Sequence, residues 1–216
     1  MSESSYNEQS RDRLLQAAVE VFGERGFRDA TVRDICARAA VNQASVNYYF
    51  RNKEALYGEA LAFAFREADR KYPPHAAADT SLPPEERLRH FIHTMIHRLT
   101  DDSQQGCHGR LIAREIADPT SALDHIVETT MRPRFRMMRD IVPRLVGPGW
   151  SQPDIDRLIH NIIGQCLVYR HSRPLIERLC PEIIDGPEAI KHTAELIARF
   201  SLAALKQLAA EKRPEP

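Results

Sequence analysis

TVRDICARAAVNQASVNYYFRNK, residues 31–53, contains two short helical patterns separated by a tight turn. Thr31 is a favourable N-cap for the first pattern, and Asp34 occupies the capping-box position three residues later. Asn42 precedes the second pattern in the same way. Two short helices joined by Ala39-Ala40-Val41 are typical of a helix-turn-helix inside a three-helix bundle.

Apolar residues at helical spacing continue on both sides of this stretch, and strand patterns are almost absent. We therefore predict an all-α chain. It would have a small N-terminal helix-turn-helix domain over residues 8–52, a connecting helix over 53–70 and a larger helical domain over 71–210. Gly26 should end the first helix in a left-handed conformation. The helix that begins near Thr120 should kink at Pro133.

Composition limits the classes of function. The 216 residues hold 30 Lys and Arg against 30 Asp and Glu, so a generally basic protein is excluded and any nucleic-acid site must be a local patch. The four cysteines form no CxxC pair and indicate reduced thiols. The start lacks an apolar signal segment and no run is long enough to span a membrane, so we expect a cytoplasmic protein.

The second short helix has a polar side with base-reading chemistry. If Val46, Tyr49 and Phe50 face the bundle, the remaining side carries Gln43, Ala44, Ser45, Asn47 and Tyr48. Gln and Asn pair with adenine edges, and hydroxyl groups reach bases or phosphates. Residues 31–53 also hold four basic side chains and one acid. An ordinary polar helix face explains these residues equally well, so both interpretations stay open at this point.

Residues 14–65 resemble the DNA-binding domain of the TetR family of repressors. The matching stretches span four helices: Leu14-Leu15-Gln16-Ala17-Ala18 with Phe22 and Gly26-Phe27, Ala30-Thr31-Val32-Arg33-Asp34-Ile35 with Ala37, Ala40-Val41, Ser45-Val46-Asn47-Tyr48-Tyr49-Phe50, and Asn52-Lys53-Glu54-Ala55-Leu56. The family usually has Gly at 40, Ser or Thr at 42 and Tyr at 47. Asn47 therefore puts the contact at that position in doubt.

The resemblance implies a role for each matching position. Thr31 and Arg33 would hold phosphates, while Tyr48, Tyr49 and Lys53 would clamp the DNA backbone. Bases would be faced by the N-terminal part of the second helix, through Gln43, Ala44, Ser45 and Asn47.

The resemblance also implies a homodimer formed by the last two long helices, here residues 151–170 and 188–209. The candidate interface residues are Ile155, Leu158, Ile159, Ile162, Ile163, Leu196, Phe200 and Leu205. The alternative is that these side chains are buried within one chain. Gly164–Arg170, Arg173-Pro174 and Arg132-Pro133-Arg134 resemble the CecR-like branch, whose members respond to antibiotics or similar xenobiotics.

Candidates for an effector pocket mix apolar and polar character. They are Phe65, Phe91, Met95, His97, Leu111, Arg114, Glu115, Met131, Phe135, Met138, Gln165 and Tyr169. Plain core packing or a solvated helix face is the competing interpretation for each of them. The arginines at 132, 134, 136 and 139 form a basic run that would suit either an anionic ligand or a solvated face.

These patterns favour a ligand-responsive repressor that binds a palindromic, double-stranded operator as a homodimer and is released by a small-molecule effector. An orphan regulator or activator without a small ligand is the first alternative. A metal-dependent all-α enzyme using His90, His93 and His97, with Cys107 nearby, is a remote one, since no HExxH motif is present. We predict no enzyme activity, no cofactor, no metal and no membrane partner.

Overall fold

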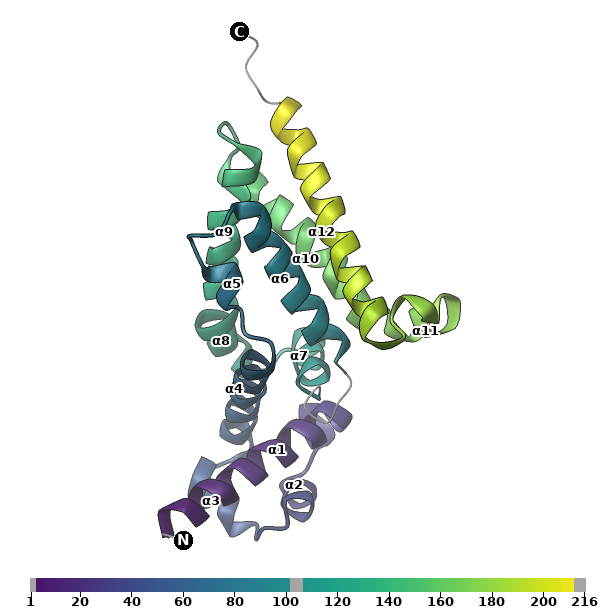
Figure 1. Cartoon of the computed structure of the whole chain (residues 1–216). Helices are drawn as coiled ribbons and strands as arrows, with labels where there is room; N and C mark the ends of the chain where they lie inside the picture. The colour runs from purple at the N-terminus through teal and green to yellow at the C-terminus, as the bar shows by residue number, and fades with distance from the viewer. Residues whose placement is uncertain (1–2, 102–106, 212–216) are drawn as a thin grey trace. The chain divides into compact units, whose positions relative to one another are not determined.

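The computed structural model describes residues 3–101 and 107–211, and every regular element in these ranges is helical (Figure 1). No helix in these ranges has the length and apolar character needed to cross a membrane. The helices form two compact units. The first holds the described residues up to Lys71 and those from Cys107 to Thr130, and the second holds Tyr72–Asp101 and Met131–Glu211. The expected boundary near residue 71 coincides with the end of the first segment of the first unit, whereas the described residues 107–130, expected in the larger domain, cluster with that unit.

The first unit is built around the long first helix. Its helices are α1 (Glu3–Asp29), α2 (Val32–Ala39), α3 (Ala44–Phe50), α4 (Lys53–Lys71), α7 (Cys107–Ala117) and α8 (Ala122–Ile126). Helix α1 packs against α2, α4 and α7, and α4 also contacts α3 and α8. Leu14, Phe22, Ile35, Leu56 and Leu61 are among its fully buried side chains.

Helix α1 is interrupted at Gly26, whose backbone lies at φ 80° and ψ 171°. The φ of Gly26 is positive, as in the predicted left-handed conformation, but its ψ lies in the extended region that is open essentially to glycine alone. Two carbonyl groups just before Gly26 accept hydrogen bonds from Arg114 of α7. Its Nε donates to the Gly23 oxygen at 2.8 Å, and a terminal nitrogen donates to the Glu24 oxygen at 2.7 Å.

The helix-turn-helix forms from the predicted local signals. The Asp34 amide donates to the Thr31 hydroxyl at 3.1 Å, and the Ala44 amide donates to the Asn42 side-chain oxygen at 2.9 Å. Between α2 and α3, Ala40 lies in the left-handed region at φ 54° and ψ 45°. The next amide, of Val41, donates back to the Cys36 carbonyl at 3.1 Å. This pair of features ends α2 as a Schellman-type cap does.

A buried carboxyl group ties α7 to α4. The Glu115 side chain accepts from the Tyr57 hydroxyl at 2.8 Å and from the Thr120 amide at 2.9 Å, and Glu115 is 1% exposed. Burial and this hydrogen bond raise the pKa of Tyr57, so its hydroxyl stays protonated and donates. Because each buried polar group has a partner, the contact costs little and joins two helices far apart in sequence.

The second unit is a helical bundle. It contains α5 (His75–Ala78), α6 (Pro84–Thr100), α9 (Arg132–Val146), α10 (Gln152–His171), α11 (Arg173–Leu179), the 3₁₀ turn η3 (Pro181–Ile183) and α12 (Gly186–Glu211). Helices α6, α9, α10 and α12 pack against one another around an apolar core, and α11 projects from the end of this bundle (Figure 1). Arg87 is buried there, where it donates to Asp140 at 2.6 Å and to the Ala77 carbonyl at 3.0 Å.

The predicted irregularity at Pro133 takes the form of a π-helical turn, η2 (Val127–Met131), directly before α9. Proline has no amide hydrogen, so the carbonyl of Thr129 lacks its usual i+4 donor. The Thr129 hydroxyl also bonds the His125 carbonyl at 2.7 Å, a contact that often bends helices. Both features favour a local change in the hydrogen-bond register.

We predict that Ala40→Gly stabilises the protein by about 0.5–1 kcal/mol. The left-handed conformation costs an L-residue roughly 1–2 kcal/mol, and the greater freedom of glycine in the unfolded chain returns part of that gain. Chemical denaturation followed by circular dichroism would measure the change. The matched control is Ala37→Gly inside α2, which should destabilise the protein; equal effects of the two changes would contradict the prediction.

We predict that Glu115→Gln lowers the free energy of unfolding by about 1–3 kcal/mol. Tyr57 and Thr120 donate to different oxygens of Glu115, and an amide has only one acceptor oxygen, so one of the two hydrogen bonds would be lost. The same denaturation experiment measures it, with the exposed Glu182→Gln as control. A stability equal to that of the control variant would show that the Tyr57–Glu115 contact does not hold the unit together.

Candidate nucleic-acid interface

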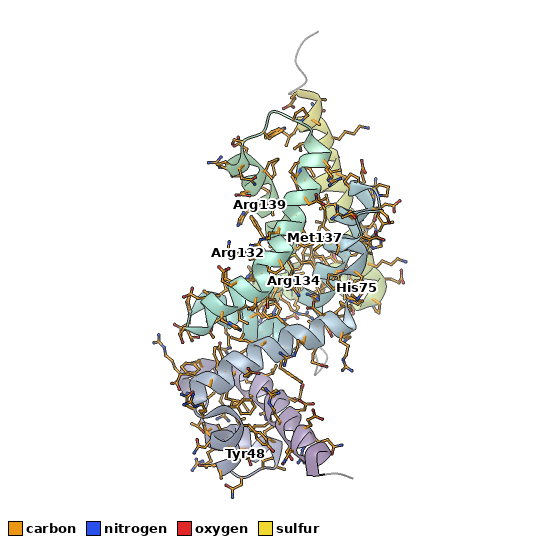
Figure 2. All side chains as sticks on the ribbon, turned by 90° about the vertical axis from the view of Figure 1, so that its left-hand side faces the viewer. Tyr48, His75, Arg132, Arg134, Met137 and Arg139 are labelled. Atoms are coloured by element: carbon orange, nitrogen blue, oxygen red, sulfur yellow. The ribbon has the colours of Figure 1, made fainter. Side chains whose placement is uncertain are left out.

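Helix α3 separates apolar and polar side chains sharply. Val46 and Phe50 are 1% and 3% exposed, whereas Tyr48 is 74% exposed. Figure 2 labels Tyr48 at the outer edge of the first unit. An exposed tyrosine at the centre of a short, otherwise anchored helix is available to a partner. The helix therefore presents a preformed surface.

The predicted base-contacting residues lie on this surface. Gln43, Ala44 and Asn47 are exposed, and Ser45 is half-buried. The nearby cap residue Thr31 is exposed as well, and its hydroxyl donates to Asp34 at 2.7 Å while accepting from the Asp34 amide. The structure thus brings together, in one unit, every residue for which we predicted a DNA contact.

The predicted backbone-contacting residues have partners within the unit. The ring of Tyr49 lies 4.8 Å from that of Tyr48, and its hydroxyl donates to the Asn7 side-chain oxygen at 3.3 Å. The Lys53 ammonium donates to the Arg28 carbonyl at 3.2 Å and lies 4.7 Å from the centre of the Phe27 ring. These contacts restrict the conformations of Tyr49 and Lys53 within the unit.

Ion pairs between helices reduce the basic excess that the sequence indicated. Arg38 donates two hydrogen bonds to Glu24, at 2.8 and 2.9 Å, and this contact lowers the pKa of the Glu24 carboxyl group. Arg25 pairs with Asp34 at 2.7 Å. Sequence reasoning missed both pairs, since residues 14 and 9 positions apart on different helices carry no spacing signal. Arg33 stays exposed.

The candidate pocket residues are divided between the two units. Phe65, Leu111, Arg114 and Glu115 belong to the first unit, and the other eight belong to the second. The polar groups of Arg114 and Glu115 are engaged with α1, α4 and Thr120, which favours the competing structural interpretation for these two residues, and their contact with a ligand stays a prediction. Leu111 is fully buried core.

Within the second unit the remaining candidates are core or core-lining residues. Met138 is fully buried, and four aromatic or sulfur side chains are partly buried against the same core: Phe91, Met95, Phe135 and Tyr169. Met131 is half-buried at the start of α9. Gln165 donates to the Ser201 hydroxyl at 3.3 Å, which joins α10 to α12. The effector pocket stays a prediction.

The histidines of α6 separate into different environments. His93 lies 3.4 Å from a Glu195 carboxyl oxygen, and His97 stacks on Tyr72 with 5.8 Å between ring centres. Burial lowers the pKa of His97 and favours its neutral form. His90 is exposed. In the part of the chain that the structure describes, no three His, Cys, Asp or Glu side chains form a metal-binding group. The side chain of Cys107 lies outside the described residues.

One arginine of the basic run on α9, Arg139, has well-defined partners within the unit. Arg132, Arg134 and Arg139 are distributed along this helix (Figure 2). Arg139 donates to Asp156 at 2.8 and 2.6 Å and lies over the Phe135 ring at 5.0 Å. These contacts favour the solvated-face interpretation for Arg139.

The candidate dimer residues divide by burial. Ile155, Ile159, Ile162 and Leu205 are at most 4% exposed and fill the core of their own chain. Leu158 and Ile163 are partly buried against that core, whereas Leu196 and Phe200 are 55% and 67% exposed. The burial of Ile155, Ile159, Ile162 and Leu205 favours the alternative that they are core residues of their own chain, and the dimer interface stays a prediction that the exposed Leu196 and Phe200 fit best.

Both the N-terminal and the C-terminal part of the chain match known protein families. Residues 14–60 match the family described as bacterial regulatory proteins, tetR family, and residues 84–205 match the C-terminal domain of the HTH-type transcriptional dual regulator CecR. CecR of Shigella flexneri is 29% identical over 172 residues, covering 76% of each chain. The repressor KstR2 of Mycolicibacterium smegmatis is 28% identical over 146 residues, covering 68% of this chain and 69% of its own.

Solved structures show the same fold. AibR, solved in complex with isovaleryl coenzyme A and operator DNA, has a TM-score of 0.68 at 16% identity and covers 88% of this chain and 97% of its own. HlyIIR, a hemolysin II transcriptional regulator, has a TM-score of 0.59 at 24% identity and covers 82% and 96%. The chain belongs to the TetR family of bacterial transcriptional regulators, with a C-terminal domain of the CecR type.

Proposed function

We propose that this protein is a ligand-responsive transcriptional repressor that binds a palindromic operator as a homodimer and is released by a small-molecule effector. The observation that carries the proposal is the surface of α3. Asn47 and Tyr48 are exposed and Ser45 is half-buried, while Val46 and Phe50 hold the helix in the first unit. This is the arrangement that a helix needs to enter the major groove.

Each exposed side chain has a matching DNA chemistry. Gln43 and Asn47 have amides that pair with adenine N6 and N7, and Ala44 suits a thymine methyl group. Arg33 and Tyr48 would hold phosphates and so set the position of the helix in the groove. With zero net charge, the attraction to DNA would come from this local surface rather than from the whole molecule.

The dimer would form on the exposed apolar side chains of the second unit. Seven large apolar side chains are exposed among the described residues, and five belong to α10, α11 and α12: Val168, Leu175, Leu179, Leu196 and Phe200. Such a concentration is typical of a surface that is covered by a partner. A two-fold dimer would present two α3 helices to half-sites one helical turn apart.

The effector would act by shifting a population of dimer states. A ligand that binds better to the state whose α3 helices no longer fit the two half-sites releases the operator. Partly buried side chains of the second unit, such as Phe91, Met95 and Tyr169, are the candidates to receive it. The AibR complex contains a ligand and operator DNA together in a related fold, which supports a ligand-binding role for this fold.

A second candidate function is regulation that includes activation. The relative from Shigella flexneri is named a dual regulator, which favours this alternative. Transcription of the genes beside the protein's own gene, measured with and without that protein, separates the two. Lower transcription in its presence supports repression, and higher transcription supports activation.

DNA binding is tested on the promoter nearest the protein's own gene, by gel shift and footprinting. We expect protection of a palindrome, with an affinity that falls as salt rises because bound phosphates release counterions. Absence of salt-sensitive binding to any nearby palindrome would reject the proposal. A thermal-shift screen then identifies effectors, which must both stabilise the protein and release the DNA.

We predict that Tyr48→Ala abolishes specific operator binding and leaves the stability of the protein within about 0.5 kcal/mol, because the side chain is 74% exposed. Gel shift and thermal denaturation measure the two effects. Tyr48→Phe is the matched control, and it separates the hydroxyl group from the ring. Normal operator binding by Tyr48→Ala would mean that α3 has a different orientation on DNA.

We predict that Phe200→Glu converts the dimer into monomers, because two carboxylates would have to be buried at a two-fold interface. Analytical ultracentrifugation measures the association, and operator affinity should fall with it. Lys191→Glu, an exposed change of charge on the same helix, is the control. A dimeric Phe200→Glu protein would place the interface elsewhere.

A further inference from the structure

The connection between α3 and α4 is a γ-turn with a positive φ at an arginine. Arg51 lies at φ 70° and ψ −45°, and the Asn52 amide donates to the Phe50 carbonyl at 2.9 Å. A γ-turn of this hand is rare and strained. Among the described residues, Arg51 and Ala40 are the two non-glycine residues with a positive φ, and they bracket α3.

The neighbours of Arg51 hold this turn in place. Phe50 is 3% exposed in the core of the first unit, and the ring lies 5.3 Å from the Arg11 guanidinium group. On the other side, the Asn52 side chain accepts from the Ala55 amide at 2.8 Å and so caps α4. Arg51 is therefore fixed from both sides in a conformation that glycine would adopt without strain.

The side chain of Arg51 keeps its charge available. It is exposed, and it has no hydrogen-bond or ion-pair partner among the residues that the structure describes. The other basic residues nearby differ, since Arg38 is paired with Glu24 and Lys53 is bound to the Arg28 carbonyl. Arg51 also follows the exposed Tyr48 by three residues, at the C-terminal end of α3.

We propose that Arg51 is a further DNA contact, which binds a phosphate where α3 ends and α4 begins. The N-terminal part of a recognition helix contacts bases, so a cation at its C-terminal end meets the sugar-phosphate backbone. Arginine presents a planar set of donors that fits phosphate oxygens. The proposal rests on the DNA-binding function above, and it accounts for a charged side chain at a strained position.

The decisive variant is Arg51→Gly, which removes the charge and the strain together. We expect the melting temperature to rise by roughly 2–4 °C. Operator affinity at about 0.15 M salt should fall roughly 10-fold or more. The slope of log affinity against log salt should become shallower by about 1.8, since a dimer carries two such contacts of about 0.9 each. Non-specific DNA should show the same change in slope.

Two further variants separate charge from strain. Arg51→Lys keeps the cation and the strained turn, so its salt slope and melting temperature should stay near those of the unchanged protein. Arg70→Gln removes a positive charge at the far end of α4, roughly 25 Å away along the helix. That distance exceeds the screening length of about 8 Å, so the salt slope should not change.

The results of these experiments separate the Arg51 phosphate contact from DNA binding by the protein as a whole. An Arg51→Gly protein with unchanged affinity and salt slope overturns the phosphate contact, while loss of binding by Tyr48→Ala in the same experiment keeps the DNA-binding function. An equal change in slope for Arg70→Gln also overturns it, because the effect would then reflect total charge. If the unchanged protein binds no DNA, both proposals fail.

Discussion

The presentation of α3 depends on burying two of its side chains. The helix has seven residues, and a helix of that length is not stable by itself in water. Val46 and Phe50 provide the missing free energy, because burial of a large apolar side chain contributes about 1.5–3 kcal/mol. Both ends of α3 are then held by residues with a positive φ, Ala40 and Arg51. The exposed polar side chains of α3 are held in place because Val46 and Phe50 anchor the helix in the core.

Helix α7 supports the same arrangement from the other side of the first unit. Arg114 binds the carbonyl groups at the end of α1, and the adjacent Glu115 binds Tyr57 of α4. These are the two helices against which the helix-turn-helix packs. A segment that begins more than thirty residues after α4 thus belongs to the same unit as the helix-turn-helix, and two of its polar side chains, Arg114 and Glu115, bind other helices of that unit.

The electrostatics of this surface come from few groups. Arg25 and Arg38 are neutralised by Asp34 and Glu24, so the charge near α3 is smaller than its composition indicates. A neutral protein with a small basic surface gains less from long-range attraction and depends more on short contacts. In the proposed DNA complex, this balance would favour discrimination between DNA sequences over general affinity, since base-edge contacts carry the specificity.

Short-range patterns in the chain were enough to predict the long helices, the cap at Thr31, the positive φ of Gly26 and the exposed face of α3, because each depends on residues within one or two helical turns. They did not predict the short helix α5, which lies in a stretch expected to be a loop. These sequence patterns did not predict contacts between residues that are far apart in the chain. Tyr57 and Glu115 are 58 positions apart, and Arg114 and Gly23 are 91 apart. The burial of Ile155 and Ile159, the exposure of Phe200 and the strained turn at Arg51 likewise depend on how helices pack, and periodicity alone does not reveal which neighbour covers a given face.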